Sequence, residues 1–169
     1  MNEEYFGGGV RLRINIEDSY EPELMGTAAS VNKVDQFLRE TNCFVIRYRD
    51  IVNDQSFSVL ANSHRKRSTL ATVLLNKRVR SNSAFCMEGE YRIKGFVERL
   101  TDEKRRRIQS LWGNLKICIC HSLLLAEIPS RVFADFLRNI LIRLIEIRRI
   151  DVFPPKGCQC AIDSVGQLH

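Results

Sequence analysis

The feature that most constrains this chain is a run of paired apolar residues between Pro129 and Arg149. Each pair follows the previous one by four residues: Val132–Phe133, Phe136–Leu137, Ile140–Leu141 and Leu144–Ile145. At a helical period of about 3.6 residues, these pairs form one continuous stripe, with most charged residues off it. Pro129 and Ser130 suit the first turn, and Arg148 and Arg149 suit the negative end of the helix dipole. The pattern therefore predicts a long amphipathic helix at the centre of the hydrophobic core.

Length and composition predict one domain. The 169 residues, of which 44% are hydrophobic and 27% charged, suffice for a single core and leave little for a second. Residues 1–9 are expected to form a flexible N-terminal arm with a glycine hinge, and residues 10–169 the globular domain. The acidic first residues lack the pattern of a secretory leader, so the six cysteines are expected to be reduced. No stretch is apolar enough to cross a membrane.

The remaining elements follow from apolar periodicity, which predicts strands, a second helix over 23–40 and a short helix over 101–108. The expected strands cover 10–16, 43–51, 57–60, 69–79 (where a helix is the alternative), 84–97 (interrupted by a bulge or tight turn at 88–90), 111–125 and, as a terminal hairpin, 150–165. Residues 62–67 are expected to form a surface loop. This mixture without regular βαβ alternation predicts an α+β single domain. Its largely antiparallel sheet would pack against the long amphipathic helix and one or two further helices.

The cysteines are the residues that most resemble a metal site. Cys118, Cys120 and His121 lie in one apolar stretch, and Cys158 and Cys160 lie in another. Four thiols and an imidazole suit zinc, but structural zinc sites usually place two residues between paired cysteines, and here there is one. Buried reduced thiols are the preferred interpretation, with zinc binding and redox chemistry as alternatives.

Signals of catalysis are weak in this sequence. None of the three histidines, His64, His121 and His169, lies near a nucleophile-elbow motif, and neither a P-loop nor a dinucleotide-binding fingerprint is present. Gly7 to Gly9 precede a predicted strand, so they cannot present a helix N-terminus to phosphate. We therefore expect no active site, no metal and no cofactor.

Positive charge is gathered in short clusters. The chain carries 26 lysines and arginines against 20 acidic residues, a net charge of +6. The densest clusters are Arg65, Lys66 and Arg67, and then Lys104, Arg105, Arg106 and Arg107. A single cluster is usually a solvated face, but several together favour contact with the phosphates of RNA or of anionic lipids. Base-reading motifs are absent, so RNA contact is expected to be non-specific.

With its elements in this order, the chain resembles a rhabdovirus matrix protein of the short, cytorhabdovirus-like kind found in plant-infecting members. The segment Phe85-Cys86-Met87-Glu88-Gly89, with Tyr91 after it, is similar to a Cys-Glu-Gly segment of animal-virus members. Residues 133–137 (FADFL) resemble the core of their second helix, and residues 161–165 (AIDSV) resemble their closing strand. The resemblance covers nearly the whole chain, without a motif that is diagnostic by itself.

This resemblance implies a non-enzymatic structural protein that associates with itself, condenses the ribonucleoprotein, links it to the inner face of a membrane and assists budding. The implied partners are further copies of the chain, the viral nucleocapsid, an anionic membrane surface, RNA and a viral glycoprotein tail. The implied locations are the virion and the host cytoplasm, peripheral on membranes. By analogy, Tyr5 and Phe6 would mediate self-association, and the two densest basic clusters would contact lipid or nucleocapsid.

Two features depart from the family pattern. The arm is short and acidic, and Pro154 and Pro155 are not followed by the tyrosine of a budding motif. Tail-driven membrane binding and recruitment of host budding machinery are therefore in doubt. The alternative function is a non-specific RNA-binding accessory protein or silencing suppressor of a virus. An enzyme is the third interpretation, and it requires a pocket where His121 and an acidic residue converge.

Overall fold

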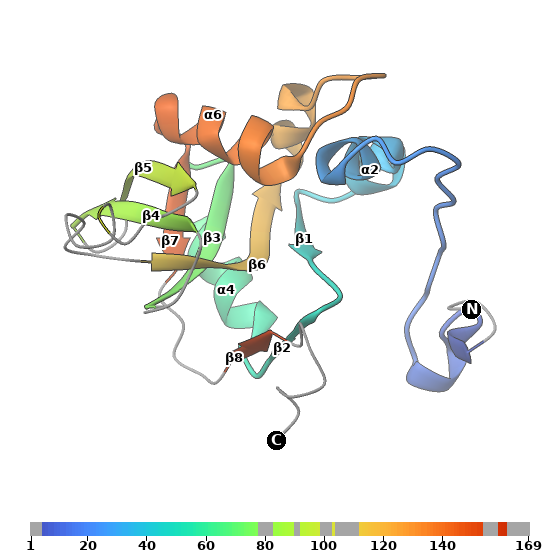
Figure 1. Cartoon of the computed structure of the whole chain (residues 1–169). Coiled ribbons are helices and arrows are strands. Elements are labelled where there is room, and N and C mark those ends of the chain that lie inside the picture. Colours follow the sequence, from blue (N-terminus) through green and yellow to red (C-terminus); the bar gives the residue numbers. More distant parts are fainter. Residues whose placement is uncertain are drawn as a thin grey trace.

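The computed structural model describes residues 5–77, 83–89, 92–98, 103, 112–153 and 159–161. Its centre is a six-stranded sheet, and a two-stranded sheet lies below it in Figure 1. The strands are β1 (Cys43–Arg47), β2 (Ile51–Asn53), β3 (Ala71–Lys77), β4 (Ser83–Glu88), β5 (Arg92–Glu98), β6 (Trp112–His121), β7 (Ile150–Phe153) and β8 (Gln159–Ala161). The helices are the 3-10 helices η1 (Val10–Leu12) and η2 (Ser122–Glu127), the α-helices α2 (Thr27–Lys33), α3 (Asp35–Arg39), α4 (Phe57–Arg65) and α6 (Ile142–Glu146), and the π-helix η3 (Phe136–Leu141).

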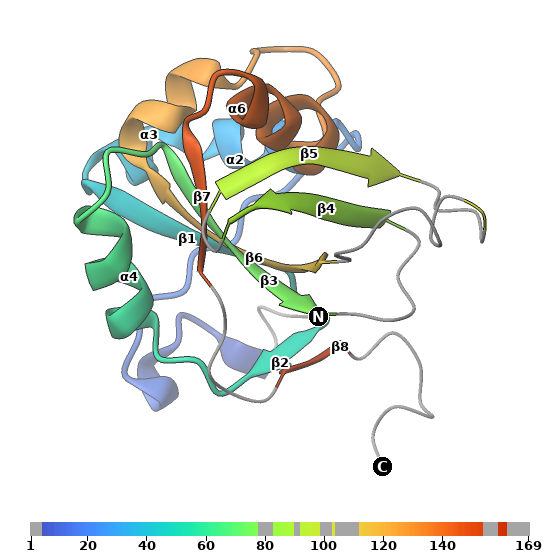
Figure 2. The same cartoon turned by 90° about the vertical axis from the view of Figure 1, so that its left-hand side faces the viewer.

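The six-stranded sheet is mixed, with the strand order β1-β6-β3-β7-β5-β4. β3 and β7 run parallel, with Ala71 opposite Ile150, and the other described pairings of this sheet are antiparallel. The last residue of β6, His121, lies opposite Cys43, the first residue of β1. The starts of β1, β3 and β7 therefore meet the end of β6 at one edge of the sheet. Figure 2 shows these strands with α4 at the left of the view.

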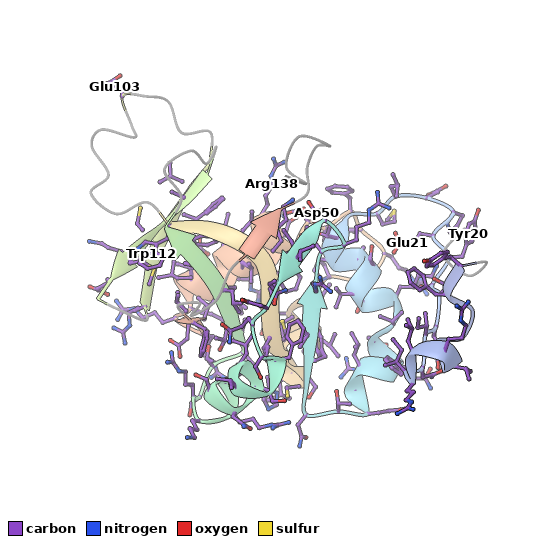
Figure 3. The ribbon with its side chains drawn as sticks, turned by 90° about the horizontal axis from the view of Figure 1, so that it is seen from below. Tyr20, Glu21, Asp50, Glu103, Trp112 and Arg138 are labelled. Atoms are coloured by element: carbon purple, nitrogen blue, oxygen red, sulfur yellow. The ribbon has the colours of Figure 1, made fainter. Side chains whose placement is uncertain are left out.

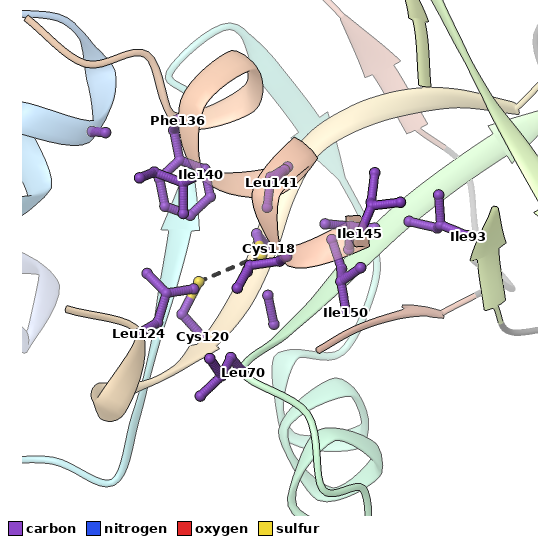
Figure 4. Close-up of a cluster of buried hydrophobic side chains, with 14 of the residues drawn as sticks. Leu70, Ile93, Cys118, Cys120, Leu124, Phe136, Ile140, Leu141, Ile145 and Ile150 are labelled. Carbon is purple, nitrogen blue, oxygen red and sulfur yellow. Dashed lines mark hydrogen bonds between the residues drawn. The ribbon is translucent and has the colours of Figure 1, made fainter. Parts of the chain in front are cut away.

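One face of this sheet packs against α2, η3 and α6 and encloses the larger hydrophobic core (Figure 1). The buried residues of η3 and α6 are Phe136, Ile140, Leu141, Leu144 and Ile145. Figure 4 shows Phe136, Ile140, Leu141 and Ile145 gathered around Cys118 and Cys120 of β6. Each large side chain buried in this way contributes about 1.5–3 kcal/mol. This face therefore supplies most of the hydrophobic stabilisation of the fold.

The opposite face is covered by α4 (Figure 1) and has a smaller apolar core. The buried apolar residues there are Ile51, Leu60, Leu74, Ile117 and Ile119. Two polar side chains, His64 of α4 and Thr72 of β3, are buried beside them. This face therefore combines apolar packing with buried polar groups.

The long amphipathic helix predicted over 129–149 is wrong. Helical structure begins at Phe136, because the Asp135 carboxylate accepts a hydrogen bond from the N–H of Arg138 at 2.9 Å and so caps the first turn. It ends at Glu146. The first apolar pair lies before the cap and is exposed, whereas the other three pairs are buried or half-buried.

The predicted fold class, an α+β domain with a largely antiparallel sheet on one long helix, is also wrong as a whole. The sheet is mixed, and short helices cover both of its faces. The terminal hairpin over 150–165 is wrong because β7 pairs with β3 and β5, whereas β8 pairs with β2. Local periodicity predicts that a segment is extended but not which distant strand it joins.

Other predicted elements have mixed outcomes. The strand over 69–79 is confirmed by β3, and the strand over 43–51 is confirmed by β1 in its first part only. The strand over 57–60 and the loop over 62–67 are wrong, because most of these residues belong to α4. The short helix over 101–108 lies almost entirely outside the described residues. Within the described part of the chain, no helix has the length and apolar character needed to span a membrane.

The N-terminal segment lies apart from the main sheet. Figure 3 shows Tyr20 and Glu21 on the opposite side of the molecule from Trp112 of β6. The strand predicted over 10–16 is wrong: its first residues form η1, and Val10 is 85% exposed. Among the described strands none pairs with this segment, so its alternating apolar residues join no sheet.

Candidate functional site

A cleft of about 490 Å³ opens at the edge of the sheet where β6 ends and β3 and β7 begin. We call it the basic cleft, and the residues that define it are His64, Arg65, Arg67, Thr69, His121 and Arg149. Backbone hydrogen bonds join the three segments that form it. The N–H of His121 donates to the carbonyl of Leu70, and the N–H of Leu70 donates to the carbonyl of Arg149, both at 2.9 Å. Residues far apart in the sequence are thereby held side by side.

The C-terminal end of α6 positions Arg149. The N–H of Arg149 donates to the carbonyl of Leu144 at 2.8 Å, and the N–H of Arg148 donates to that of Ile145 at 3.1 Å. These two bonds form a Schellman motif, with Arg148 in the left-handed conformation at a φ of 54°. The hydroxyl of Thr69 donates to the carbonyl of Arg149 at 2.6 Å. The side chain of Arg149 is exposed at the cleft, and no described group pairs with its guanidinium.

Helix α4 and the turn after it supply two more arginines. Arg65 lies in the last turn of α4, is exposed, and donates to the side-chain oxygen of Asn62 at 3.3 Å. Arg67 is half-buried and forms an ion pair with Asp151 at 3.6 Å. Among the described residues that line the cleft there is no aspartate or glutamate. The charges of Arg65 and Arg149 are therefore not neutralised by a carboxylate of the described lining.

His64 is the most deeply buried ionisable group of the cleft, with 2% of its surface exposed. Its Nδ1 lies 2.8 Å from Oγ1 of Thr72, which is also buried. Burial lowers the pKa of His64, and the neighbouring His121 and Arg65 lower it further, against the opposing effect of Asp151. The imidazole of His64 is therefore neutral at neutral pH.

This arrangement suits the binding of a small molecule that carries a phosphate or carboxylate group. Guanidinium groups bind phosphate and carboxylate groups through paired N–H donors. Neutral imidazoles add hydrogen bonds of fixed direction without adding charge. A cleft with unneutralised arginines also raises the local concentration of anions.

The structure brings only part of the predicted contact set together. Arg65 and Arg67 line the basic cleft, whereas Lys66 is exposed outside its lining. The second cluster, residues 104–107, lies outside the described residues. The predicted loop is instead the last turn of α4 and the turn that follows it, and Arg65 and Arg67 line the same cleft.

The aromatic pair predicted for self-association lies on the N-terminal segment. The rings of Tyr5 and Phe6 meet edge to face, with centroids 4.8 Å apart, and both side chains are exposed. Self-association through them stays a prediction.

The predicted zinc ligands do not converge within the described residues. Cys118 and Cys120 are buried with their sulfur atoms 3.4 Å apart (Figure 4), and burial raises the pKa of Cys120 well above its usual range. The His121 ring projects to the other face of the strand, because neighbouring strand residues alternate. No group of three potential metal ligands occurs in the described part of the chain. Cys158 lies outside it, and the side chain of Cys160 is not described.

Sequence reasoning missed the site as a whole. It placed His64 in a loop, whereas the structure has it in α4. It considered His121 only as a zinc ligand or as the histidine of a pocket with an acidic residue, and it did not connect Arg149 with either histidine. One usable signal was present: Ser56 begins a helix by accepting from the N–H of Val59, and Leu60 and His64 then lie four residues apart on its buried side.

Comparisons with known proteins identify the fold. No protein-family model and no curated protein matches this chain. A putative glucose-1-phosphate thymidylyltransferase from Bacillus anthracis, in complex with a sucrose, is similar with a TM-score of 0.76 at 13% identity, over 98% of this chain and 67% of that one. HddC from Yersinia pseudotuberculosis complexed with GMP-PN gives 0.68 at 12% identity, over 97% and 70%. A further structure of HddC gives 0.67 at 13% identity, over 87% and 61%.

These comparisons overturn the resemblance to a rhabdovirus matrix protein, because the three similar structures are of nucleotidyltransferases and not of viral matrix proteins. The predicted function as a viral matrix protein is therefore wrong, and the viral RNA-binding alternative has no support. The prediction that the chain is not an enzyme is contradicted by the same structures. The implied partners and locations stay untested. At 12–13% identity, the likeness shows that this chain has a nucleotidyltransferase-like fold.

Proposed function

We propose that this chain binds a nucleotide in the basic cleft, with the phosphate held by Arg65 and Arg149. The observation that carries the proposal is the convergence of these arginines with His64 and His121 in a cleft whose described lining has no carboxylate. Charge-assisted bonds from guanidinium to phosphate are about twice as strong as bonds between neutral groups. The cleft therefore favours a phosphorylated ligand over a neutral one of the same shape.

The size of the cleft supports a small ligand rather than a polymer. Its volume of about 490 Å³ lies within the range of about 300–1,000 Å³ that small-molecule sites occupy. A long single strand of RNA is instead held in an extended groove with aromatic stacking platforms. A mononucleotide matches both the volume and the charge of the basic cleft.

The fold supports a nucleotide as the class of ligand. HddC has the same fold and was determined with GMP-PN, and another structure of this fold is named a putative thymidylyltransferase. Nucleotidyl transfer is therefore the second candidate function. It predicts that the chain releases pyrophosphate from a nucleoside triphosphate when a sugar 1-phosphate and Mg²⁺ are present. Release no faster than from a heat-denatured sample would contradict it.

Calorimetric titration with GMP and with guanosine tests the binding proposal. GMP is expected to bind at least tenfold more tightly than guanosine, because only GMP carries the phosphate. The double substitution Arg65→Ala with Arg149→Ala is expected to abolish most of this preference. Equal affinities for GMP and guanosine would refute the proposal.

Lys66→Ala is the matched control for these arginine substitutions. Lys66 lies next to Arg65 in the chain, is exposed and lies outside the described cleft lining. Its removal changes the net charge by one unit, as each arginine substitution does. We expect the affinity for GMP to stay within about twofold, because exposed charges at a distance are screened by salt. An effect as large as that of the double substitution would show that overall charge, and not the cleft, binds the nucleotide.

A further inference from the structure

His121, at the edge of the basic cleft, has a hydrogen bond that fixes the position of its proton. It ends β6 and caps η2, and its Nδ1 accepts a hydrogen bond from the N–H of Leu123 at 3.1 Å. A backbone N–H can only donate, so the nitrogen that receives it carries no proton. The neutral imidazole has a single proton, which must then lie on Nε2.

Nε2 is the ring nitrogen left for a ligand. His121 is half-buried and lines the cleft, and no described protein group bonds to its Nε2. The described lining around it has no carboxylate, and it includes the guanidinium groups of Arg65, Arg67 and Arg149. Nε2 of His121 is therefore a hydrogen-bond donor surrounded by positive charge, and it is complementary to a negatively charged acceptor.

We infer that His121 donates a hydrogen bond from Nε2 to a phosphoryl oxygen of the ligand, with its tautomer set by the N–H of Leu123. This inference rests on the proposed function, because it needs a phosphate in the basic cleft. His121 thereby selects for a phosphoryl acceptor. It does so as a neutral donor and adds to the charge-based attraction of Arg65 and Arg149.

Two substitutions separate the capping role of His121 from its donor role. Asparagine is a favoured N-cap residue, so His121→Asn keeps an acceptor for the start of η2, but its side chain is too short to replace Nε2. His121→Gln extends an amide nitrogen toward the position of Nε2. Hydrogen bonds to charged groups contribute about 1.5–3 kcal/mol, which corresponds to about tenfold or more in affinity. We therefore expect His121→Asn to bind GMP and inorganic phosphate about tenfold more weakly than the wild type.

The glutamine variant and the imidazole itself supply the remaining tests. His121→Gln is expected to bind GMP within about threefold of the wild type, because a single donor is retained. Thermal unfolding of both variants checks that each is folded. Nitrogen-15 NMR of the wild-type histidine side chains at neutral pH is expected to show the proton of His121 on Nε2.

The outcomes distinguish this inference from the proposed function. If GMP binds to the wild type and equally to His121→Asn, or if the proton lies on Nδ1, the donor role is refuted and nucleotide binding stands. If the glutamine variant loses as much affinity as the asparagine variant, the donor role is likewise refuted. If GMP and inorganic phosphate do not bind to the wild type, the proposed function itself fails, and the donor role fails with it.

Discussion

The two faces of the main sheet differ in what they bury. The face under α2, η3 and α6 encloses a continuous apolar cluster, with the thiols of Cys118 and Cys120 inside it. The face under α4 encloses a smaller cluster together with the polar side chains of His64 and Thr72. Burying a polar group lowers stability unless it is hydrogen-bonded, and on the second face His64 and Thr72 are buried as a pair, with Nδ1 and Oγ1 2.8 Å apart. The first face holds the fold together, and the edge of the second holds the basic cleft.

The largest expected effect on stability comes from a substitution in the apolar face. Ile140 of η3 is 1% exposed within the larger cluster, so Ile140→Ala removes apolar contacts and leaves a cavity. The free energy of unfolding is expected to fall by about 2–5 kcal/mol, as measured by urea denaturation. The affinity of the folded variant for GMP is expected to be unchanged. A parallel loss of affinity would show that the two faces are not separable.

A smaller effect is expected at the polar pair of the second face. Thr72→Val keeps the shape of the side chain but removes the hydroxyl that lies 2.8 Å from Nδ1 of His64. The buried imidazole then lacks its partner, and the free energy of unfolding is expected to fall by about 1–3 kcal/mol. Thr72→Ser, which retains the hydroxyl, is the control and should lose clearly less. Equal losses of stability in the two variants would show that altered packing, and not the lost hydroxyl, causes the effect.

The same histidine predicts a pH dependence of stability. The pKa of His64 in the folded chain lies below its ordinary value of 6.5. Between these two values the unfolded chain binds a proton that the folded chain does not bind, so the free energy of unfolding falls as the pH falls below about 6.5. One such proton gives a slope of at most about 1.4 kcal/mol per pH unit. Urea denaturation from pH 7.5 downward should show a shallower slope for His64→Gln, and an unchanged slope would exclude His64 as its source.

The smallest expected effect concerns the start of η3. Asp135 accepts hydrogen bonds from the N–H of Arg138 and from the hydroxyl of Thr27. Asp135→Ala is expected to lower the free energy of unfolding by about 1 kcal/mol, and Asp135→Asn, which retains a capping oxygen, by less. Thermal denaturation of the two variants side by side measures the difference. If the two lose the same stability, the cap does not define where this helix begins.

The segment 129–149 shows how far the sequence predicts the apolar face. Its apolar spacing correctly indicates which residues of η3 and α6 face the core. The boundary is wrong because Ser130 and Asp135 are both acceptable capping residues. Thr27 of α2, which donates to the Asp135 carboxylate and accepts from the N–H of Phe136, supports the cap at Asp135. Val132 and Phe133 continue the stripe in sequence but lie in the loop before the helix.

The basic cleft was much harder to predict. Its residues come from the end of α4, from the segment between α4 and β3, from the end of β6 and from the turn after α6. They meet through the mixed pairing of the sheet. The dense charge at 65–67 was visible in the sequence, but a charge cluster does not say which of its members share a cleft with His121 or Arg149. Likewise, the order of elements suggested a family that the fold does not support, because the same order of helices and strands is compatible with several pairings.

A crystal structure of the chain with GMP tests the central claim most directly. We expect the phosphate in the basic cleft, within hydrogen-bonding distance of the guanidinium groups of Arg65 and Arg149 and of Nε2 of His121. The main alternative position is the groove of about 310 Å³ between α2 and Val132, which is lined in part by Glu21 and Glu23. GMP bound there, with the basic cleft holding none, would contradict the assignment of the functional site to the α4 side of the sheet.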